Sequence, residues 1–170
     1  MLLEAIGENP DREGLRDTPN RVARAWAEFV DYAPGSIDTA FQSIKVDQMV
    51  VIRDMLVFSY CEHHLLPFDT KISIGYLSGE KVLGLSKLAR ICHKHAHKLQ
   101  LQERLVESVA VELKDILGHE NVAVIGSGRH SCMYMRGIKT DGLVFSSSMN
   151  GVFLSEASAR SEFLQFAGVR

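Results

Sequence analysis

Residues 49–76, MVVIRDMLVFSYCEHHLLPFDTKISIGY, decide the fold class of this chain. The first ten are rich in β-branched and other apolar residues, as strands usually are. From residue 71 to 76, apolar side chains alternate with small or polar ones, and this period of two predicts a half-buried strand. A polar cluster, Cys61-Glu62-His63-His64, follows the first apolar stretch directly. The segment therefore predicts strands with a group of potential ligands beside them.

The segments on either side complete an α+β pattern. Before the strands, apolar residues recur at helical spacing after Thr18-Pro19, which predicts an N-cap followed by Pro at the first helical position. After them, two helices are expected, one starting at Ser86 and one over 102–117 with Gly118 as its stop. Three further strands and a last short helix are expected at 122–125, 133–135, 143–149 and 158–166. Paired strands around two helices favour α+β with antiparallel hairpins.

Composition indicates a folded domain with an appendage. The chain has 170 residues, of which 46% are hydrophobic and 24% charged, so it can bury a sizeable core. We expect a helical segment at 1–45 and the main domain at 46–170. A net charge of −2 argues against a broad basic surface for nucleic acid. An anion would have to bind at a local cluster of cations.

The cysteine count and the apolar runs indicate a cellular compartment. Three cysteines cannot form a closed disulfide framework, and sparse cysteine is typical of intracellular proteins. The first residues lack the basic segment of a secretory signal. No apolar run approaches the roughly 18 residues that span a bilayer. We therefore expect a cytoplasmic protein that does not enter a membrane.

Cys61 and His64 have the C-x-x-H spacing that lets a thiolate and an imidazole converge on one ion. Cys132, in His130-Ser131-Cys132, supplies a third soft ligand. Three such ligands leave the fourth tetrahedral position open for water, which is typical of catalytic zinc. His63 and His130 would then remain beside the ion as free imidazoles, suited to proton transfer near neutral pH.

Two other interpretations of these residues stay open. The two cysteines could be buried thiols, with His64 a hydrogen-bonded core residue. The site could also be a structural Cys₂His₂ site, with His63 or His130 as the fourth ligand.

A second cluster suits a phosphate group. If Ser86 caps its helix, the free backbone N–H groups there favour an anion, and Lys87 and Arg90 could face the same ligand. Arg136 could add a bidentate phosphate contact. The alternative is a solvated helix face. Glu103 could accept two parallel N–H donors such as guanine offers, or it could simply compensate the dipole at a helix start.

Five blocks of the chain, in order, resemble the GTP cyclohydrolase I family, and the resemblance covers nearly the whole sequence. The blocks are residues 7–15 with 18–23, then 61–68, 84–91, 99–105 and 130–137. The resemblance implies a tunnelling fold: antiparallel sheets with helices outside, assembled as pentamers into a barrel and paired into a decamer. The N-terminal helix would lie outside that barrel. Its implied reaction converts GTP to 7,8-dihydroneopterin triphosphate and formate, the first step of pterin or folate-type biosynthesis.

The resemblance also implies a role for each matching residue. Zinc is held by Cys61, His64 and Cys132. His63 and His130 act in proton transfer, with His130 protonating the imidazole nitrogen of guanine, and Gln102 and Glu103 hold the guanine. The triphosphate is received by Ser86, Lys87, Arg90 and Arg136. Each site lies between subunits of a homo-oligomer.

Alternatives to this activity are a catalytically idle member that binds a purine or pterin or scaffolds partners, and a related cyclohydrolase that stops at another product or uses iron. Two departures from the family pattern stand out. His93 and His97, at i and i+4 of a helix, could bind a second metal or simply be solvated. Gly126-Ser127-Gly128 makes the strand before His130 more flexible than is usual, which puts the placement of His130 in question.

Overall fold

The computed structural model describes residues 2–37, 40–42 and 48–169. By its internal contacts the chain divides into two compact units, Met1–Tyr32 and Ala33–Arg170. The domain boundary expected at 45/46 lies outside the described residues. The first unit holds helices α1, Leu2–Ala5, and α2, Thr18–Val30. Thr18 was expected to be the N-cap but is already the first residue of α2, and Asp17 holds the N-cap position. The Thr18 hydroxyl instead accepts a hydrogen bond from Arg21 (2.9 Å).

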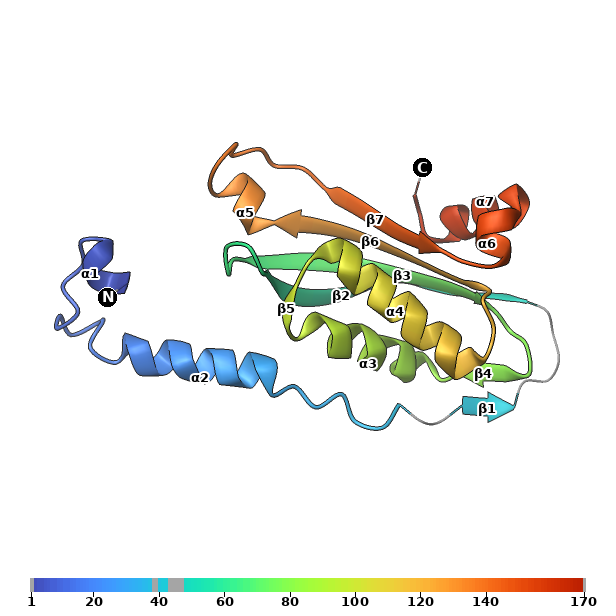
Figure 1. The fold of residues 1–170 in the computed structure, drawn as a ribbon, viewed down its shortest axis with the longest axis horizontal. Helices are drawn as coiled ribbons and strands as arrows, with labels where there is room; N and C mark the ends of the chain where they lie inside the picture. The colour runs from blue at the N-terminus through green and yellow to red at the C-terminus, as the bar shows by residue number, and fades with distance from the viewer. Residues whose placement is uncertain (1, 38–39, 43–47, 170) are drawn as a thin grey trace. The chain divides into compact units, whose positions relative to one another are not determined.

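The second unit contains two sheets and five helices among its described residues. Its elements are β1 Ala40–Gln42, β2 Met49–Cys61, β3 Pro67–Leu77, β4 Lys81–Leu83, α3 Leu85–Ala96, β5 Leu99–Gln100, α4 Gln102–Leu117, β6 Val122–His130, α5 Ser131–Tyr134, β7 Val144–Met149, α6 Val152–Ser155 and α7 Ala157–Phe166 (Figure 1).

The main sheet has the strand order β5-β2-β3-β6-β7, and β1 pairs with β4 separately. All neighbours in the main sheet are antiparallel except β5, which runs parallel to β2 because α3 carries the chain back along the sheet. The sheet is therefore mixed rather than purely antiparallel. A mixed sheet with helices packed on it is compatible with the expected tunnelling fold.

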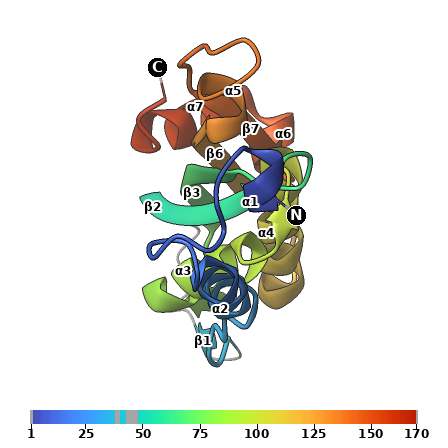
Figure 2. The same cartoon turned by 90° about the vertical axis from the view of Figure 1, so that its left-hand side faces the viewer.

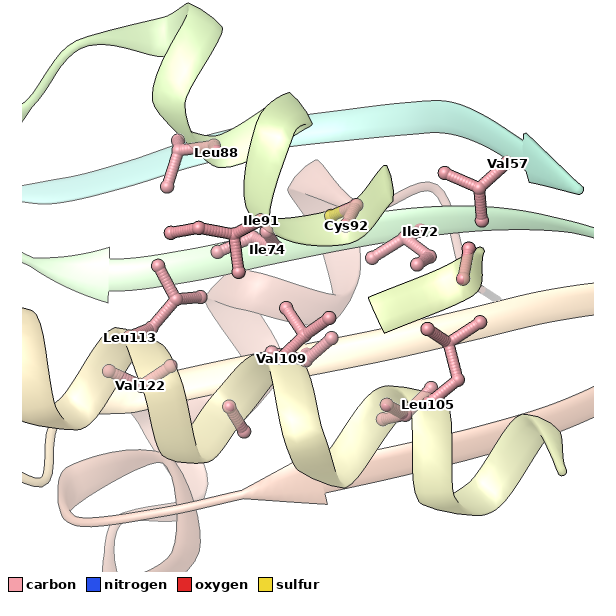
Figure 3. Close-up of a cluster of buried hydrophobic side chains, with 14 of the residues drawn as sticks. Val57, Ile72, Ile74, Leu88, Ile91, Cys92, Leu105, Val109, Leu113 and Val122 are labelled. Carbon is pink, nitrogen blue, oxygen red and sulfur yellow. The ribbon is translucent and has the colours of Figure 1, made fainter. Parts of the chain in front are cut away.

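Helices α3 and α4 cover one face of this sheet (Figures 1 and 2). Their apolar stripes meet alternate residues of the strands in one core, in which Leu88, Ile91, Leu113 and Ile74 are fully buried (Figure 3). The stripe of α4 and its stop at Gly118, which has φ 76°, agree with the pattern in the sequence. Burial of this amphipathic face holds the two helices on the sheet.

Helix α7 forms a second, smaller core on the opposite face, because successive side chains of a strand point to opposite sides. In β6, Val122 and Val124 join the first core, whereas Ala123 and Ile125 join the second with Phe163. Residues 71–76 lie in a strand as expected, but the expected half-burial is wrong, because residues 72–76 are buried on both faces.

Two other expectations are corrected. Residues 133–135 are not a strand, because the chain leaves β6 through helix α5, where the Met135 N–H donates to the Ser131 carbonyl (3.0 Å). Three residues are too few for an alternating pattern to identify a strand. Ser86 is not an N-cap: Gly84 holds that position, and its carbonyl accepts the N–H of Lys87 (2.9 Å). Within the described residues, no helix is long and apolar enough to cross a bilayer.

Candidate active site and metal centre

Four segments that are distant in the sequence converge at one end of the main sheet. Strand β2 ends at Cys61, which pairs with Gln100 just before α4. Strand β3 begins beside it, and its Phe68 pairs with His130 at the end of β6. Helix α5 follows immediately (Figure 1). The sheet register therefore gathers most of the residues singled out in the sequence.

The turn after β2 gives the C-x-x-H spacing its geometry. The Cys61 carbonyl accepts hydrogen bonds from the N–H groups of Leu65 (2.9 Å) and His64 (3.4 Å), as in one turn of a helix. The Cys61 N–H donates to Leu66 (2.9 Å) and closes the loop, in which Leu65 has a φ of 54°. One turn of this kind returns the side chain of His64 to the side of Cys61.

The metal-ligating atoms of Cys61, His64 and Cys132 all lie within 4.8 Å of one another. The pKa of Cys132 is raised, mainly by burial and to a smaller extent by the neighbouring Cys61 thiol. Two sulfurs and one imidazole nitrogen at this separation fit a soft or borderline cation such as zinc. Neither His63 nor His130 belongs to the group, which leaves a fourth ligand position. Among the described residues, no third ligand joins His93 and His97, whose rings lie 5.8 Å apart.

A pocket of about 490 Å³ opens beside these ligands. It is lined in part by Cys61 and Cys132, and by further predicted site residues: His63, Gln102, Glu103 and His130. Glu103 is exposed in the first turn of α4, whereas Gln102 is only 1% exposed. The pocket therefore offers a carboxylate and two imidazoles next to the candidate metal centre.

His130 is held from two directions. Its ring stacks on Phe68, with centroids 4.7 Å apart and planes 7° from parallel, and its Nε2 lies 2.9 Å from Gln102 Oε1. Burial lowers the pKa of His130, while the carboxylates of Glu103 and Asp69 oppose that shift. Sequence reasoning missed Phe68, because its contact with His130 depends on the register between β3 and β6.

The residues expected to receive a triphosphate are divided in one chain. Ser86 and Lys87 lie in the first turn of α3 and Arg90 lies near its middle, whereas the far end of this twelve-residue helix leads into β5 (Figure 1), whose Gln100 lines the pocket. None of the three lines the pocket. Lys87 is 5% exposed, and the Arg90 guanidinium donates to the Ser36 carbonyl (2.8 Å).

Arg136 lies at the candidate metal centre. Its Nη1 donates a hydrogen bond to His64 Nε2 (2.8 Å). Arginine has no acceptor, so this bond uses the lone pair of that imidazole nitrogen.

The family model for GTP cyclohydrolase I matches residues 1–168. The chain belongs to the GTP cyclohydrolase I family. GTP cyclohydrolase 1 of Sulfurihydrogenibium sp. is 44% identical over 166 residues, covering 96% of this chain and 88% of that protein. The Aquifex aeolicus enzyme is 43% identical (97% and 90% covered), and the Rhodopirellula baltica enzyme 46% identical (96% and 73% covered). The expectation of an enzyme of this family is confirmed.

A solved structure of the archaeosine synthase QueF-Like in the apo form has a TM-score of 0.43 and 16% identity to this member of the GTP cyclohydrolase I family. The match covers 61% of this chain and 96% of that one, and it is too distant to carry a conclusion.

One ion pair in this family member was not predicted from its sequence. Arg104 Nη1 and Nη2 donate to the two carboxylate oxygens of Glu62 at 2.7 and 3.1 Å. This hydrogen-bonded pairing lowers the pKa of Glu62. The pair ties the ligand-bearing turn to the start of α4. The sequence held no signal for this pair beyond the two charges, since Glu62 and Arg104 are 42 positions apart and only the fold brings them together.

Proposed function

We propose that this member of the GTP cyclohydrolase I family is a zinc-dependent enzyme that converts GTP to 7,8-dihydroneopterin triphosphate and formate. One observation carries the proposal: the ligand atoms of Cys61, His64 and Cys132 meet within 4.8 Å, beside a pocket lined by His63 and His130. The names of the relatives support the same reaction.

The donor set selects the metal in this proposal. Thiolates and imidazole favour zinc over magnesium or calcium. Zinc bound by three protein ligands would supply a Lewis acid that lowers the pKa of water. The chain's own contribution is to fix two thiols and one imidazole on β2, the turn that follows it and α5, and to keep a fourth position toward the pocket.

The pocket residues have matching roles in guanine binding and proton transfer. The exposed carboxylate of Glu103 accepts the N1–H and exocyclic amine of guanine. In its protonated form, His130 donates a proton to N7, which makes C8 of guanine a better electrophile for hydrolysis. His63 moves protons as the opened ring loses formate and the ribose rearranges and recloses. These roles need only groups that already line one pocket.

The triphosphate is bound by a second copy of the chain. Ser86, Lys87 and Arg90 lie on the first half of α3 and do not line the pocket of their own chain, so a neighbour's α3 supplies them. Arg136, whose guanidinium contacts His64, adds a further cation. Phosphate contacts remote from C8 supply binding energy and orientation. The proposed homo-oligomer, a pentameric barrel paired into a decamer, places each site between subunits.

The test combines metal analysis with mass spectrometry of the products formed from GTP. We expect stoichiometric zinc, formate and the pterin triphosphate. Cys132→Ser should lose both zinc and turnover. His130→Ala should keep zinc and lose turnover by roughly 10²- to 10⁴-fold, the usual contribution of one general acid or base.

Three outcomes would contradict the proposal. A zinc-loaded, assembled sample that binds GTP but makes no product would indicate an idle purine-binding member. Iron in place of zinc, or another product, would indicate a related cyclohydrolase. Loss of the metal in His130→Ala would show that the division between ligands and proton-transfer groups is wrong.

A further inference from the structure

The carboxamide of Gln102 is enclosed between His130 and the backbone of the sheet. Its Nε2 donates to the carbonyls of Val144 (2.8 Å) and Gly126 (3.3 Å) and to the Ser146 hydroxyl (3.1 Å). Its Oε1 lies 2.9 Å from His130 Nε2 and 3.4 Å from the Thr70 hydroxyl. Both ends of this buried amide are therefore engaged by the protein.

These partners fix which end of the amide faces His130. Carbonyl oxygens only accept hydrogen bonds, so the NH₂ group must face Val144 and Gly126. The reversed orientation would bury Oε1 against two carbonyl oxygens that cannot donate to it. Oε1 therefore faces His130. Because Oε1 can only accept, His130 Nε2 must carry the hydrogen of this 2.9 Å bond.

We propose that Gln102 is a positioning residue that holds neutral His130 in its Nε2–H form, so that Nδ1 is the nitrogen that exchanges a proton in the pocket. Within the described residues, Nδ1 of His130 makes no hydrogen bond. Phe68 fixes the plane of the ring, and Gln102 fixes its direction within that plane. The catalytic meaning of this placement rests on the function proposed above, whereas the placement itself does not.

Gly128 gives Gln102 the space that it needs. A Cβ at position 128 would collide with Gln102 Oε1 and would lie 2.6 Å from the Asp69 carbonyl oxygen and 2.8 Å from the Thr70 hydroxyl. Backbone oxygen cannot move aside as a flexible side chain can. The glycine that made the placement of His130 questionable in the sequence is therefore a condition for that placement.

The same contacts change the role expected for Gln102 toward guanine. Its two amide hydrogens already have three acceptors, and its oxygen already has two donors. The side chain has no capacity left for a nucleobase. Among the two residues expected to hold guanine, Glu103 is the one whose side chain is exposed at the pocket.

Gln102→Met tests this assignment, because methionine keeps the volume and removes both ends of the amide. We expect kcat to fall roughly 10- to 100-fold, part of the 10²–10⁴ that a general acid or base contributes, with KM for GTP unchanged. Val109→Ala, in the core of the same helix, is the matched control. It should lower the melting temperature without lowering kcat. A raised KM with unchanged kcat in Gln102→Met would instead show a guanine-holding side chain.

Nitrogen NMR of protein labelled with ¹⁵N-histidine provides a readout independent of turnover. The spectra are recorded above the pH at which imidazole is charged. The His130 signals are those that disappear in His130→Ala. We expect the bonded hydrogen on Nε2 in the wild type and a mixture of both neutral forms in Gln102→Met. A hydrogen on Nδ1 in the wild type would overturn the inference, even if the variant failed to fold. Absence of turnover in the wild type would refute the proposed function while this spectrum still decided the placement.

Discussion

His95 and Glu112 show how burial and charge act on a single side chain in this protein. His95 Nε2 and Glu112 Oε2 lie 2.6 Å apart between α3 and α4, and both side chains are 14% exposed. Lys94 Nζ contacts the same carboxylate at 2.8 Å. Burial lowers the pKa of His95, the hydrogen bond and charge of Glu112 oppose that shift, and Lys98 and Lys94 add to it. The folded protein therefore favours neutral His95.

The direction of this shift predicts the effect of acid on stability. Because the folded-state pKa lies below that of an unfolded histidine, about 6.5, the unfolded chain takes up the proton first as pH falls. The stabilisation is complete above that value and is lost as pH falls through the folded pKa. Urea unfolding between about pH 8 and pH 5 should show a smaller loss of unfolding free energy in His95→Gln than in the wild type.

Glu112→Gln provides the opposing variant. It removes the group that raises the pKa of His95, so its stability should fall more steeply with acid than that of the wild type. Arg104, Glu107 and Asp115 line the same surface hollow and remain in both variants. Equal slopes in His95→Gln and the wild type would show that this histidine does not contribute to acid sensitivity.

At the scale of elements, the sequence predicted the parts whose signals are local. Helix α4 agrees at both ends, because its apolar stripe and Gly118 are encoded within one segment. The convergence of Cys61 and His64 follows from a single turn. The stack of Phe68 on His130 joins residues far apart in the chain, and no local sequence pattern predicts the strand register that pairs them. Burial of residues 72–76 on both faces likewise depends on α7, which lies some 80 residues further along the chain.

The packing of α7 against the sheet yields a prediction for Gly75. A Cβ there would lie 2.5 Å from a ring carbon of Phe163, which is fully buried and packs against Phe153 at 5.6 Å. Gly75→Ala should therefore lower the unfolding free energy by about 1–3 kcal/mol through overpacking. Phe163→Ala should cost about 3–5 kcal/mol. Both variants should keep the metal, because Gly75 lies near the opposite end of β3 from Phe68.

The control and the double variant make this prediction specific. Gly79→Ala places its methyl 3.5 Å from the nearest heavy atom and should leave stability unchanged. Gly75→Ala combined with Phe163→Ala should cost less than the sum of the two changes, since the new methyl enters space that the ring has left. Additive costs, measured by urea unfolding, would mean that α7 does not rest on Gly75.

At the scale of the whole molecule, the surface of one chain suits assembly. Large apolar side chains stand exposed on strands of the main sheet: Leu56 is 46% exposed, and Phe58 and Phe145 are each 57% exposed. Apolar surface of this kind commonly marks contacts with other chains. In the same chain, the cations Lys87 and Arg90 on the first half of α3 do not line the pocket beside the candidate metal centre. Both features follow if each site is completed by a neighbouring copy.

Mixed assemblies of two inactive variants test that arrangement directly. Cys132→Ser removes a metal ligand from one half of the site, and Arg90→Ala removes a cation from the other half. If both halves came from one chain, every site in a mixture would carry one defect and activity would stay absent. If they come from different chains, random mixing in equal amounts makes about one quarter of the sites intact, because each half is unaltered in about half of its copies.

Co-expression with two affinity tags and sequential purification isolates the mixed assemblies. We expect roughly a quarter of the wild-type turnover there, and none in either variant alone. The zinc content should be near half of the wild-type value, because only the subunits with Cys132 bind zinc. Recovered turnover with any other zinc content would contradict the division of the site between subunits.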